Sequence, residues 1–331
     1  MRITPSNQAL PLWRSILFVP AVSDRFVESA LKQAADVLQI DLEDSVGPDQ
    51  KAFARERVAA IADRFAQAGR QVSVRVNRPW RLLVRDLEAV VRPAVQAIAL
   101  PKVPDAAFIQ SVSEVLDELE HESRMARGHT RIIAMVEDAQ GLACIHEIAA
   151  AHPRVIGLIV GAEDLAVSLQ MSVDDDGLYV PNVMAVAAAR RAGILPIGFI
   201  GSVADFKDAD QFRARIRRAR KLGFESAFCV HPSQVSVLNE EFAPSEAEVA
   251  HAQAVIEAYE AQMSHGKAAF SFKGRMVDMP VVDQARQIMR RHQAVQNNAS
   301  FPTLQFLNQH GPLRIAPVSY THLTLPTKRI V

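Results

Sequence analysis

The chain has 331 residues, which is enough for one large α/β domain with an appendage. Its 37 basic residues balance 37 acidic ones, so no strong field favours a nucleic-acid or membrane partner. No apolar run is long enough to span a bilayer, and the N-terminus lacks the pattern of a secretion signal. Cys144 and Cys229 lie in apolar segments, which indicates reduced cysteines. We therefore expect a cytoplasmic protein.

Eight short apolar runs follow one another along the chain, separated by segments with helical periodicity. Apolar runs that alternate with helices predict parallel strands with crossover helices, and eight in a row predict a closed TIM (β/α)8 barrel. We place this barrel in residues 12–242. The predicted strands cover residues 15–20, 37–44, 72–77, 97–103, 131–138, 155–161, 195–200 and 227–230.

The periodicity changes beyond the barrel. Residues 245–264 and 278–295 predict two helices, which together form a C-terminal helical extension or lid over residues 243–300. The last segment, residues 316–331, fits neither period and contains a string similar to a translated sequencing adapter. We treat it as a non-native tail and exclude it from the fold.

Two carboxylates stand at the ends of consecutive predicted strands. Glu137 ends the fifth strand and Asp164 follows the sixth. Neighbouring strands lie about 4.8 Å apart, so the two side chains can converge on one hard cation such as Mg²⁺. The alternative is that Glu137 is a solvated strand end and Asp164 a helix N-cap.

Arg75 lies on the third predicted strand and shares one face with Ser73 and Asn77. If that face points into the barrel, the arginine needs a carboxylate partner, and Asp41 or Glu43 on the second strand can supply one. One interpretation ends with this internal salt bridge. The other adds an anionic ligand held by the guanidinium fork.

Other cations occur near strand ends, and several expected motifs are missing. Arg14, Arg25 and Lys102, taken singly, are typical of surface charges, and the basic run over residues 213–221 predicts a solvated helix face. There is no glycine-rich dinucleotide or phosphate loop, no zinc-type Cys/His spacing and no serine-hydrolase elbow.

The ordered motifs resemble the HpcH/HpaI aldolase and citrate lyase β-subunit family over about residues 12–295. No single motif is decisive, but the ordered set is specific. The motifs are Arg14-Ser15-Ile16-Leu17-Phe18-Val19-Pro20, Ile40-Asp41-Leu42-Glu43-Asp44-Ser45-Val46, Val74-Arg75-Val76-Asn77, Leu100-Pro101-Lys102-Val103, Gly161-Ala162-Glu163-Asp164-Leu165-Ala166, His231-Pro232-Ser233-Gln234 and Gly274-Arg275-Met276-Val277-Asp278-Met279-Pro280.

This resemblance implies a TIM barrel that cleaves carbon–carbon bonds in 3-hydroxyacyl-CoA thioesters such as malyl-CoA, citramalyl-CoA or citryl-CoA. It implies Mg²⁺ held by Glu137 and Asp164, and an Arg75 that polarises substrate oxygens. It also implies that Asp278 acts as an acid/base delivered by a neighbouring subunit of a homotrimer or homohexamer. We include Glu43 and Asp44 among the catalytic residues, and expect Arg14, Arg25 and Lys102 to contact CoA.

Three departures from the family pattern border the expected active-site face. They are Ala21 after Val-Pro, Ala227 before the His-Pro motif, and Phe199-Ile200-Gly201-Ser202 in place of an Asp-containing strand end. Two rival functions therefore stay open. One is a CoA-independent, metal-dependent pyruvate aldolase, against which the appended helices argue. The other is a lyase subunit that works only with an acyl-carrier partner.

Overall fold

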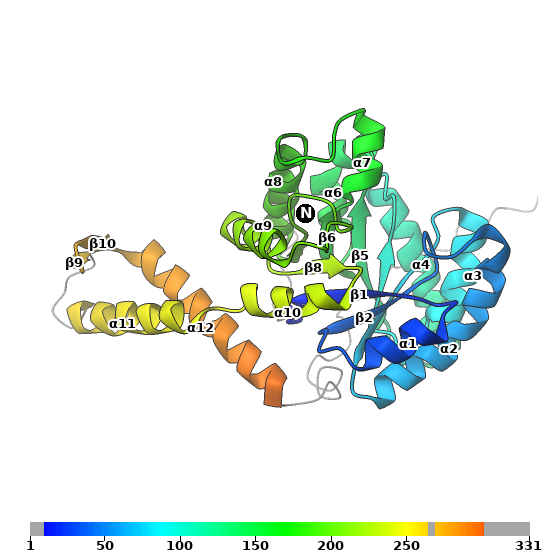
Figure 1. Ribbon diagram of the computed structural model, residues 1–331, viewed down its shortest axis with the longest axis horizontal. Coiled ribbons are helices and arrows are strands. Elements are labelled where there is room, and N and C mark those ends of the chain that lie inside the picture. The colour runs from blue at the N-terminus through cyan, green and yellow to red at the C-terminus, as the bar shows by residue number, and fades with distance from the viewer. Residues whose placement is uncertain (1–9, 264–268, 301–331) are drawn as a thin grey trace, which may run out of the picture.

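A computed structural model describes residues 10–263 and 269–300, and shows a TIM-type barrel (Figure 1). Eight parallel strands pair in the order β7-β6-β5-β4-β3-β2-β1-β8. A parallel bridge between Ile197 and Ser226 brings the last two strands together and nearly closes the barrel. The strands are β1 Ser15–Pro20, β2 Val37–Asp41, β3 Gln71–Arg75, β4 Ala97–Leu100, β5 Arg131–Val136, β6 Val155–Val160, β7 Leu195–Ile197 and β8 Ala227–Cys229.

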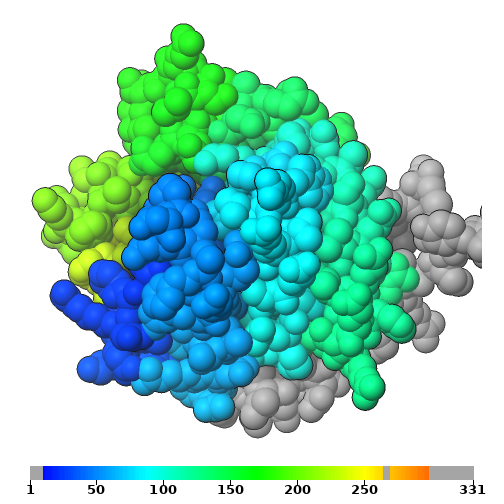
Figure 2. Space-filling model, turned by 90° about the vertical axis from the view of Figure 1, so that its right-hand side faces the viewer, coloured from blue at the N-terminus to red at the C-terminus, as the bar shows by residue number. Residues whose placement is uncertain are grey.

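Helices follow the strands and surround the barrel, as the fold class predicted. In Figure 2 the first half of the chain, coloured blue to blue-green, forms most of the surface that faces the viewer. The described helices around the barrel are α1 Asp24–Leu31, the short 3-10 turn η1 Pro48–Gln50, α2 Lys51–Gln67, α3 Trp80–Val90, α4 Ala106–Glu122, α5 Ala139–Ala143, α6 Ile145–Ala149, α7 Ala162–Leu169, α8 Asp175–Ala192, α9 Ala209–Leu222 and α10 Pro232–Glu241.

The core has two layers because successive strand residues point to opposite sides. On β5, Ile132 and Ala134 face the helices, whereas Ile133 and Met135 face the barrel interior. The same alternation carries Glu137 to the interior side of the mouth. The alternation thus places polar residues of several strands, among them Asp41, Arg75 and Glu137, at the carboxyl edge, where a TIM barrel builds its active site.

Most strands end one to three residues before their predicted ends. The second strand was predicted to reach residue 44 and the fourth residue 103, but β2 ends at Asp41 and β4 at Leu100. The chain leaves the ladder there and turns across the mouth. The residues predicted at strand ends therefore lie on short loops held by specific side-chain contacts.

The C-terminal extension is an arm with its own small core. It contains α11 Glu246–Met263, a hairpin of β9 Phe270–Phe272 and β10 Arg275–Val277 that the sequence did not predict, and α12 Met279–Ser300. The two helices pack through Val255, Tyr259 and Val282. The arm projects away from the barrel (Figure 1). The tail over residues 316–331 lies outside the described residues.

One arginine ties the base of this arm to the barrel. Arg291 of α12 donates to the carbonyl of Phe242 at 2.8 Å, to the carbonyl of Glu225 at 2.7 Å and to that residue's carboxylate at 2.7 Å. Among the described helices, none is long and apolar enough to cross a membrane.

Candidate functional site

A cavity of about 440 Å³ opens at the carboxyl ends of the strands. One side of it is apolar, with Phe18, Met135, Ile159 and Phe228 from four different strands. The lining also contains charged side chains. The charged lining residues are Asp41, Asp44, Arg75, Glu137, Glu163 and Asp164.

Arg75 is fixed by carboxylates, as one of the two sequence interpretations expected. Its Nε donates to Asp41 Oδ1 at 2.7 Å and its Nη2 to Asp41 Oδ2 at 2.8 Å, a two-point contact between adjacent strands. Nη1 donates to Asp44 at 3.0 Å and lies 3.0 Å from Glu43 Oε2. The Cζ atom stands 4.6 Å from the centre of the Phe18 ring, so an aromatic wall covers one face of the guanidinium.

This network shifts the ionisation of its members. Burial alone would raise the pKa of Asp41, but the hydrogen bonds and charge of Arg75 hold it below its usual value. Although burial opposes its charge, Arg75 has a pKa raised well above its usual value by Asp41 and the other carboxylates. Both groups therefore stay charged at neutral pH.

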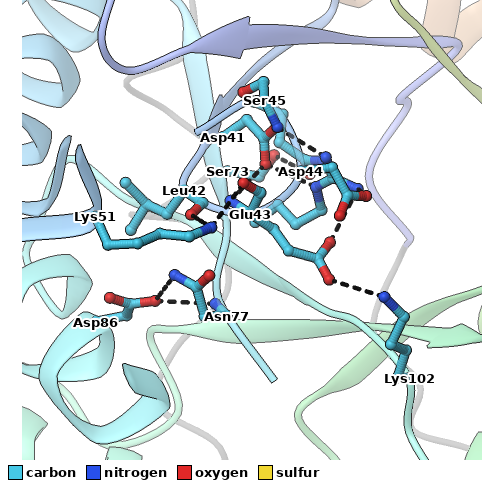
Figure 3. A network of polar contacts seen from close by, with 12 residues as sticks. Asp41, Leu42, Glu43, Asp44, Ser45, Lys51, Ser73, Asn77, Asp86 and Lys102 are labelled. Carbon is cyan, nitrogen blue, oxygen red and sulfur yellow. Dashed lines mark hydrogen bonds and ion pairs between the residues drawn. The ribbon is translucent and has the colours of Figure 1, made fainter. Parts of the chain in front are cut away.

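The loop that carries Glu43 and Asp44 is held from both sides. Asp41 accepts hydrogen bonds from the backbone N–H groups of Glu43 at 3.0 Å and Ser45 at 3.1 Å. Lys51, at the start of α2, donates to the carbonyls of Leu42 at 2.9 Å and Glu43 at 2.8 Å (Figure 3). Lys51 was missed in the sequence because nothing in its spacing indicates that it grips a loop nine residues earlier.

Lys102 lies on the loop after β4 and contacts residues that follow three other strands: Glu43 after β2, Glu137 after β5 and Asp164 after β6. It has φ of 51°, a left-handed conformation that is uncommon for a lysine. This turn directs its backbone N–H to Glu137 Oε2 at 2.9 Å. Its ammonium lies 3.2 Å from Asp164 and 3.5 Å from Glu43, the contact drawn in Figure 3. The structure thus brings Lys102 among the carboxylates.

Glu137 and Asp164 both line the cavity, as their strand positions predicted. Glu137 is 5% exposed, and burial, assisted by the charges of Glu43 and Asp164, raises its pKa to about 7. Gly161 lies between them in sequence and leaves the space that the Glu137 carboxylate fills. A Cβ at Gly161 would lie 2.6 Å from Glu137 Oε1.

These residues fit a magnesium ion. Mg²⁺ takes one or two protein carboxylates and fills its remaining positions with water and substrate oxygens. Within the described residues, no group of three acidic, His or Cys side chains is arranged to hold a metal, so a closed protein cage is not offered. Glu137 and Asp164 lie beside an open cavity, and the charge of buried Glu137 is not fully offset by nearby cations, as its raised pKa shows. Such a pair matches a magnesium site that is open to water and substrate on one side.

Three expected site residues lie away from the cavity. Arg14 is at the amino end of β1, the opposite end of the barrel, where it binds Asp36 at 2.8 Å and the Asn239 carbonyl at 3.3 Å. Arg25 is exposed on α1, and within the described part of the chain it forms no ion pair. Asp278 lies at the start of α12 on the projecting arm, and does not line the cavity.

Comparison with known proteins places the chain in a family. The model of the HpcH/HpaI aldolase/citrate lyase family matches residues 14–232. The chain belongs to this family. It is 34% identical over 320 residues to an L-malyl-CoA/beta-methylmalyl-CoA lyase of Cereibacter sphaeroides, covering 89% of this chain and 98% of that protein. It is also 34% identical over 283 residues to the citrate lyase subunit beta of Escherichia coli, covering 84% and 92% respectively.

Solved structures agree with this membership. The CitE protein of Mycobacterium tuberculosis, in complex with magnesium, acetoacetate and coenzyme A, matches with a TM-score of 0.67 and 32% identity, covering 86% of this chain and 99% of that one. The same protein in complex with magnesium and pyruvate matches with a TM-score of 0.60 and 28% identity, covering 85% and 99%. The family resemblance drawn from the ordered motifs is confirmed.

Proposed function

We propose that this chain is a magnesium-dependent lyase that cleaves a carbon–carbon bond in a 3-hydroxyacyl-CoA thioester, giving an acyl-CoA and a keto acid. The observation that carries the proposal is the meeting of Glu137, Asp164 and Arg75 at one cavity, in a barrel whose relatives are lyases of CoA thioesters and of citrate. The CitE complex with magnesium and coenzyme A supports both the cofactor and the substrate class.

The reaction breaks the bond between C2 and C3 of the acyl chain. The C3 hydroxyl loses its proton and its oxygen becomes the carbonyl of the keto acid. The electron pair of the broken bond stays on C2 as a thioester enolate, which then accepts a proton. Two demands follow: a positive environment for the developing charge, and a group that moves protons.

The chain's own residues meet the first demand. Glu137 and Asp164 would hold Mg²⁺, which when bound supplies Lewis-acid stabilisation to substrate oxygens. Arg75 adds a permanently charged guanidinium, aligned by Asp41 before the substrate arrives. Glu43 and Asp44 act through Arg75, because their carboxylates flank its Nη1 and limit its rotation.

We assign the proton-moving role to Asp278, delivered to a neighbouring subunit. Within one chain this aspartate sits on the arm, whose tip points away from the barrel (Figure 1). Its carboxylate accepts only a long bond, 3.4 Å, from the N–H of Val281 at the start of α12. A homotrimer or homohexamer would bring the arm of one subunit over the cavity of the next.

The two unpaired cysteines, Cys144 and Cys229, support a reducing compartment such as the cytoplasm.

Coenzyme A contact is assigned to Arg25. It lies just beyond the carboxyl end of β1, is exposed and has no acidic partner in the described residues, as a phosphate-binding cation requires. Lys102 is engaged with carboxylates and Arg14 lies at the far end of the barrel. We therefore assign neither Lys102 nor Arg14 to the proposed CoA site.

The test is turnover of a panel of hydroxyacyl-CoA thioesters by the purified full chain with Mg²⁺ and with EDTA. Cleavage that requires both CoA and Mg²⁺ is expected. Equal cleavage of the free hydroxy acids would instead identify a CoA-independent pyruvate aldolase. Activity only on thioesters of an acyl-carrier protein would identify a lyase subunit that needs a partner.

A further inference from the structure

We infer that Arg78 is a positioning residue for the metal site: it holds the turn at Lys102, and that turn orients the Glu137 carboxylate. The inference rests on the proposed function, because Glu137 is the metal ligand that it concerns. Arg78 lies on the loop between β3 and α3, just after the family motif of residues 74–77, and does not line the cavity.

The Glu137 carboxylate depends on one backbone N–H group. The N–H of Lys102 donates to Glu137 Oε2 at 2.9 Å, and within the described part of the chain this is the only hydrogen bond to that carboxylate. Partners of this kind fix the orientation of a metal ligand. How well Glu137 is placed therefore depends on how firmly the backbone at Lys102 is held.

The peptide group between Lys102 and Val103 is held on both sides. Its N–H, which belongs to Val103, donates to the Met135 carbonyl of β5 at 3.0 Å. Its carbonyl, which belongs to Lys102, accepts from Arg78 Nε at 3.0 Å. Because a peptide group is planar, these two contacts restrict its rotation. The left-handed φ of 51° at Lys102 then turns the preceding N–H toward Glu137.

The left-handed turn at Lys102 needs this support. A residue other than glycine is strained at positive φ, and the conformation persists only where surrounding contacts enforce it. Arg78 supplies such a contact from the neighbouring loop, and a charged donor bonds a carbonyl more strongly than a neutral one does. Without it the peptide group is released on one side, and the Lys102 N–H no longer has a fixed direction.

Arg78 is itself aligned by an aromatic ring. Its Cζ lies 3.9 Å from the centre of the Phe108 ring, and Trp80 packs against the same ring with centres 5.0 Å apart. Phe108 is 6% exposed and stands in the first turn of α4, where its N–H donates to the N-cap Asp105 at 2.8 Å. A guanidinium that lies over a fixed aromatic ring is restricted in its rotation. The ring thus directs Nε toward the carbonyl.

The charge of Arg78 alone would have the opposite effect on the metal. Among the described residues Arg78 forms no ion pair, and burial lowers its pKa although Asp138 and Asp105 oppose that shift. A positive charge repels a divalent cation. Removing only the charge would therefore strengthen Mg²⁺ binding, whereas removing the bond to Lys102 would weaken it. The sign of the change distinguishes the two effects.

Calorimetric titration of Mg²⁺ into the full chain, without substrate, tests the inference. Arg78→Met keeps an apolar stem against Phe108 and removes the donor. We expect it to raise the Kd for Mg²⁺ about ten-fold, as loss of an outer partner of a metal ligand does. Arg78→Lys keeps a charged donor and is expected to recover part of that loss. An unchanged or lower Kd for Arg78→Met would overturn the inference.

Arg92 offers a matched control. It is also partly buried and donates to a backbone carbonyl, that of Ala89, at 2.9 Å from Nε and 2.7 Å from Nη2. It lies between α3 and the amino end of β4, away from the cavity. Arg92→Met is expected to leave the Kd for Mg²⁺ unchanged. If both methionine variants raise it equally, the effect is a general loss of stability and the inference is wrong.

A second measurement does not need the metal. Residues of one contact network change stability non-additively, whereas distant residues add. In EDTA, Arg78→Met is expected to lower the melting temperature less in a Glu137→Ala background than in the wild type, and Arg92→Met to lower it equally in both. Equal shifts for Arg78→Met would overturn the inference. If the wild type binds no Mg²⁺, the proposed function fails, and this comparison alone decides the role of Arg78.

Discussion

Gly161 faces the Glu137 carboxylate so closely that a Cβ on it would lie 2.5 Å from Glu137 Cγ. Its φ of −81° suits any residue, so space and not backbone freedom requires glycine. Gly161→Ala is expected to displace the carboxylate and weaken Mg²⁺ binding by about ten-fold or more, since metal sites tolerate little misplacement of a ligand. Calorimetric Mg²⁺ titration measures this. Gly47→Ala is the matched control, because its φ is −61° and its Cβ would meet only the Asp49 side chain.

Glu137→Gln and Asp164→Asn are each expected to lower turnover by at least about 10²–10³ while the fold is kept, because metal-centred charge stabilisation is lost. Near-normal turnover of either variant at low Mg²⁺ would refute the metal assignment. Circular dichroism and melting curves check the fold.

Without metal, Glu137→Gln should also have a larger free energy of unfolding than the wild type at high pH. Burial raises the pKa of Glu137 from its usual 4.5 to about 7. A carboxyl with a raised folded pKa costs stability as the pH rises from 4.5 through 7, because the folded state then holds an unfavourable charge. In EDTA at pH 8, Glu137→Gln is expected to be more stable than the wild type by on the order of 1–3 kcal/mol. The difference should shrink at pH 5, and a constant difference across this range would contradict the shift.

Arg75→Lys is expected to be nearly as damaging to kcat as Arg75→Ala. The arginine contacts both oxygens of Asp41 and one of Asp44 at the same time, and an ammonium cannot reproduce this fork. Steady-state kinetics of the two variants decide. Wild-type-like rates for the lysine variant would indicate a salt bridge with no part in the reaction.

Arg25→Gln is expected to raise KM for the CoA thioester by about three- to ten-fold and to leave kcat nearly unchanged, as loss of one exposed phosphate contact would do. The effect should diminish at high salt, because exposed charges are screened. Arg14→Gln is the comparison. It breaks the bond to Asp36 at the opposite end of the barrel, so it should lower the melting temperature without changing KM. A larger KM effect at Arg14 than at Arg25 would reverse the assignment.

Asp278→Ala distinguishes a helix cap from an acid/base. A lost cap should lower stability by about 0.5–2 kcal/mol and leave turnover unchanged. A lost acid/base should lower turnover by roughly 10²–10⁴ with an unchanged melting temperature, which is the result expected here. Mixing Asp278→Ala with Glu137→Gln subunits should restore part of the activity. If the subunits exchange and none returns, each site is built from a single chain.

The barrel and the order of its strands were predictable because apolar periodicity reports which residues are buried, whereas most strand ends were predicted one to three residues too late. Strand alternation predicted that Arg75 pairs with Asp41 or Glu43, and in the structure it contacts both. Lys51 and Gly161 were not predictable. Lys51 acts through backbone carbonyls, which carry no sequence signal. Gly161 acts by lacking a side chain, which leaves room for the Glu137 carboxylate.

The placement of the cations shows another limit of sequence reasoning. Arg14, just before β1, and Arg25, on α1, are only eleven positions apart, yet β1 carries the chain from one end of the barrel to the other between them. Sequence proximity therefore grouped two residues that the fold separates. The hairpin of β9 and β10 escaped prediction because each strand has only three residues.

Because Arg291 anchors the arm to the barrel, a change of tilt at this residue would be amplified along α12. About 18 Å of helix separates this arginine from the first residue of α12, at about 1.5 Å per residue. A tilt of about 5° at Arg291 would move the far end by roughly 1.6 Å over that length, and a displacement of about 1 Å can cost 10²-fold in rate. Substitutions at Glu225 or Arg291, on the flank of the barrel, would then change catalysis in a subunit to which they do not belong.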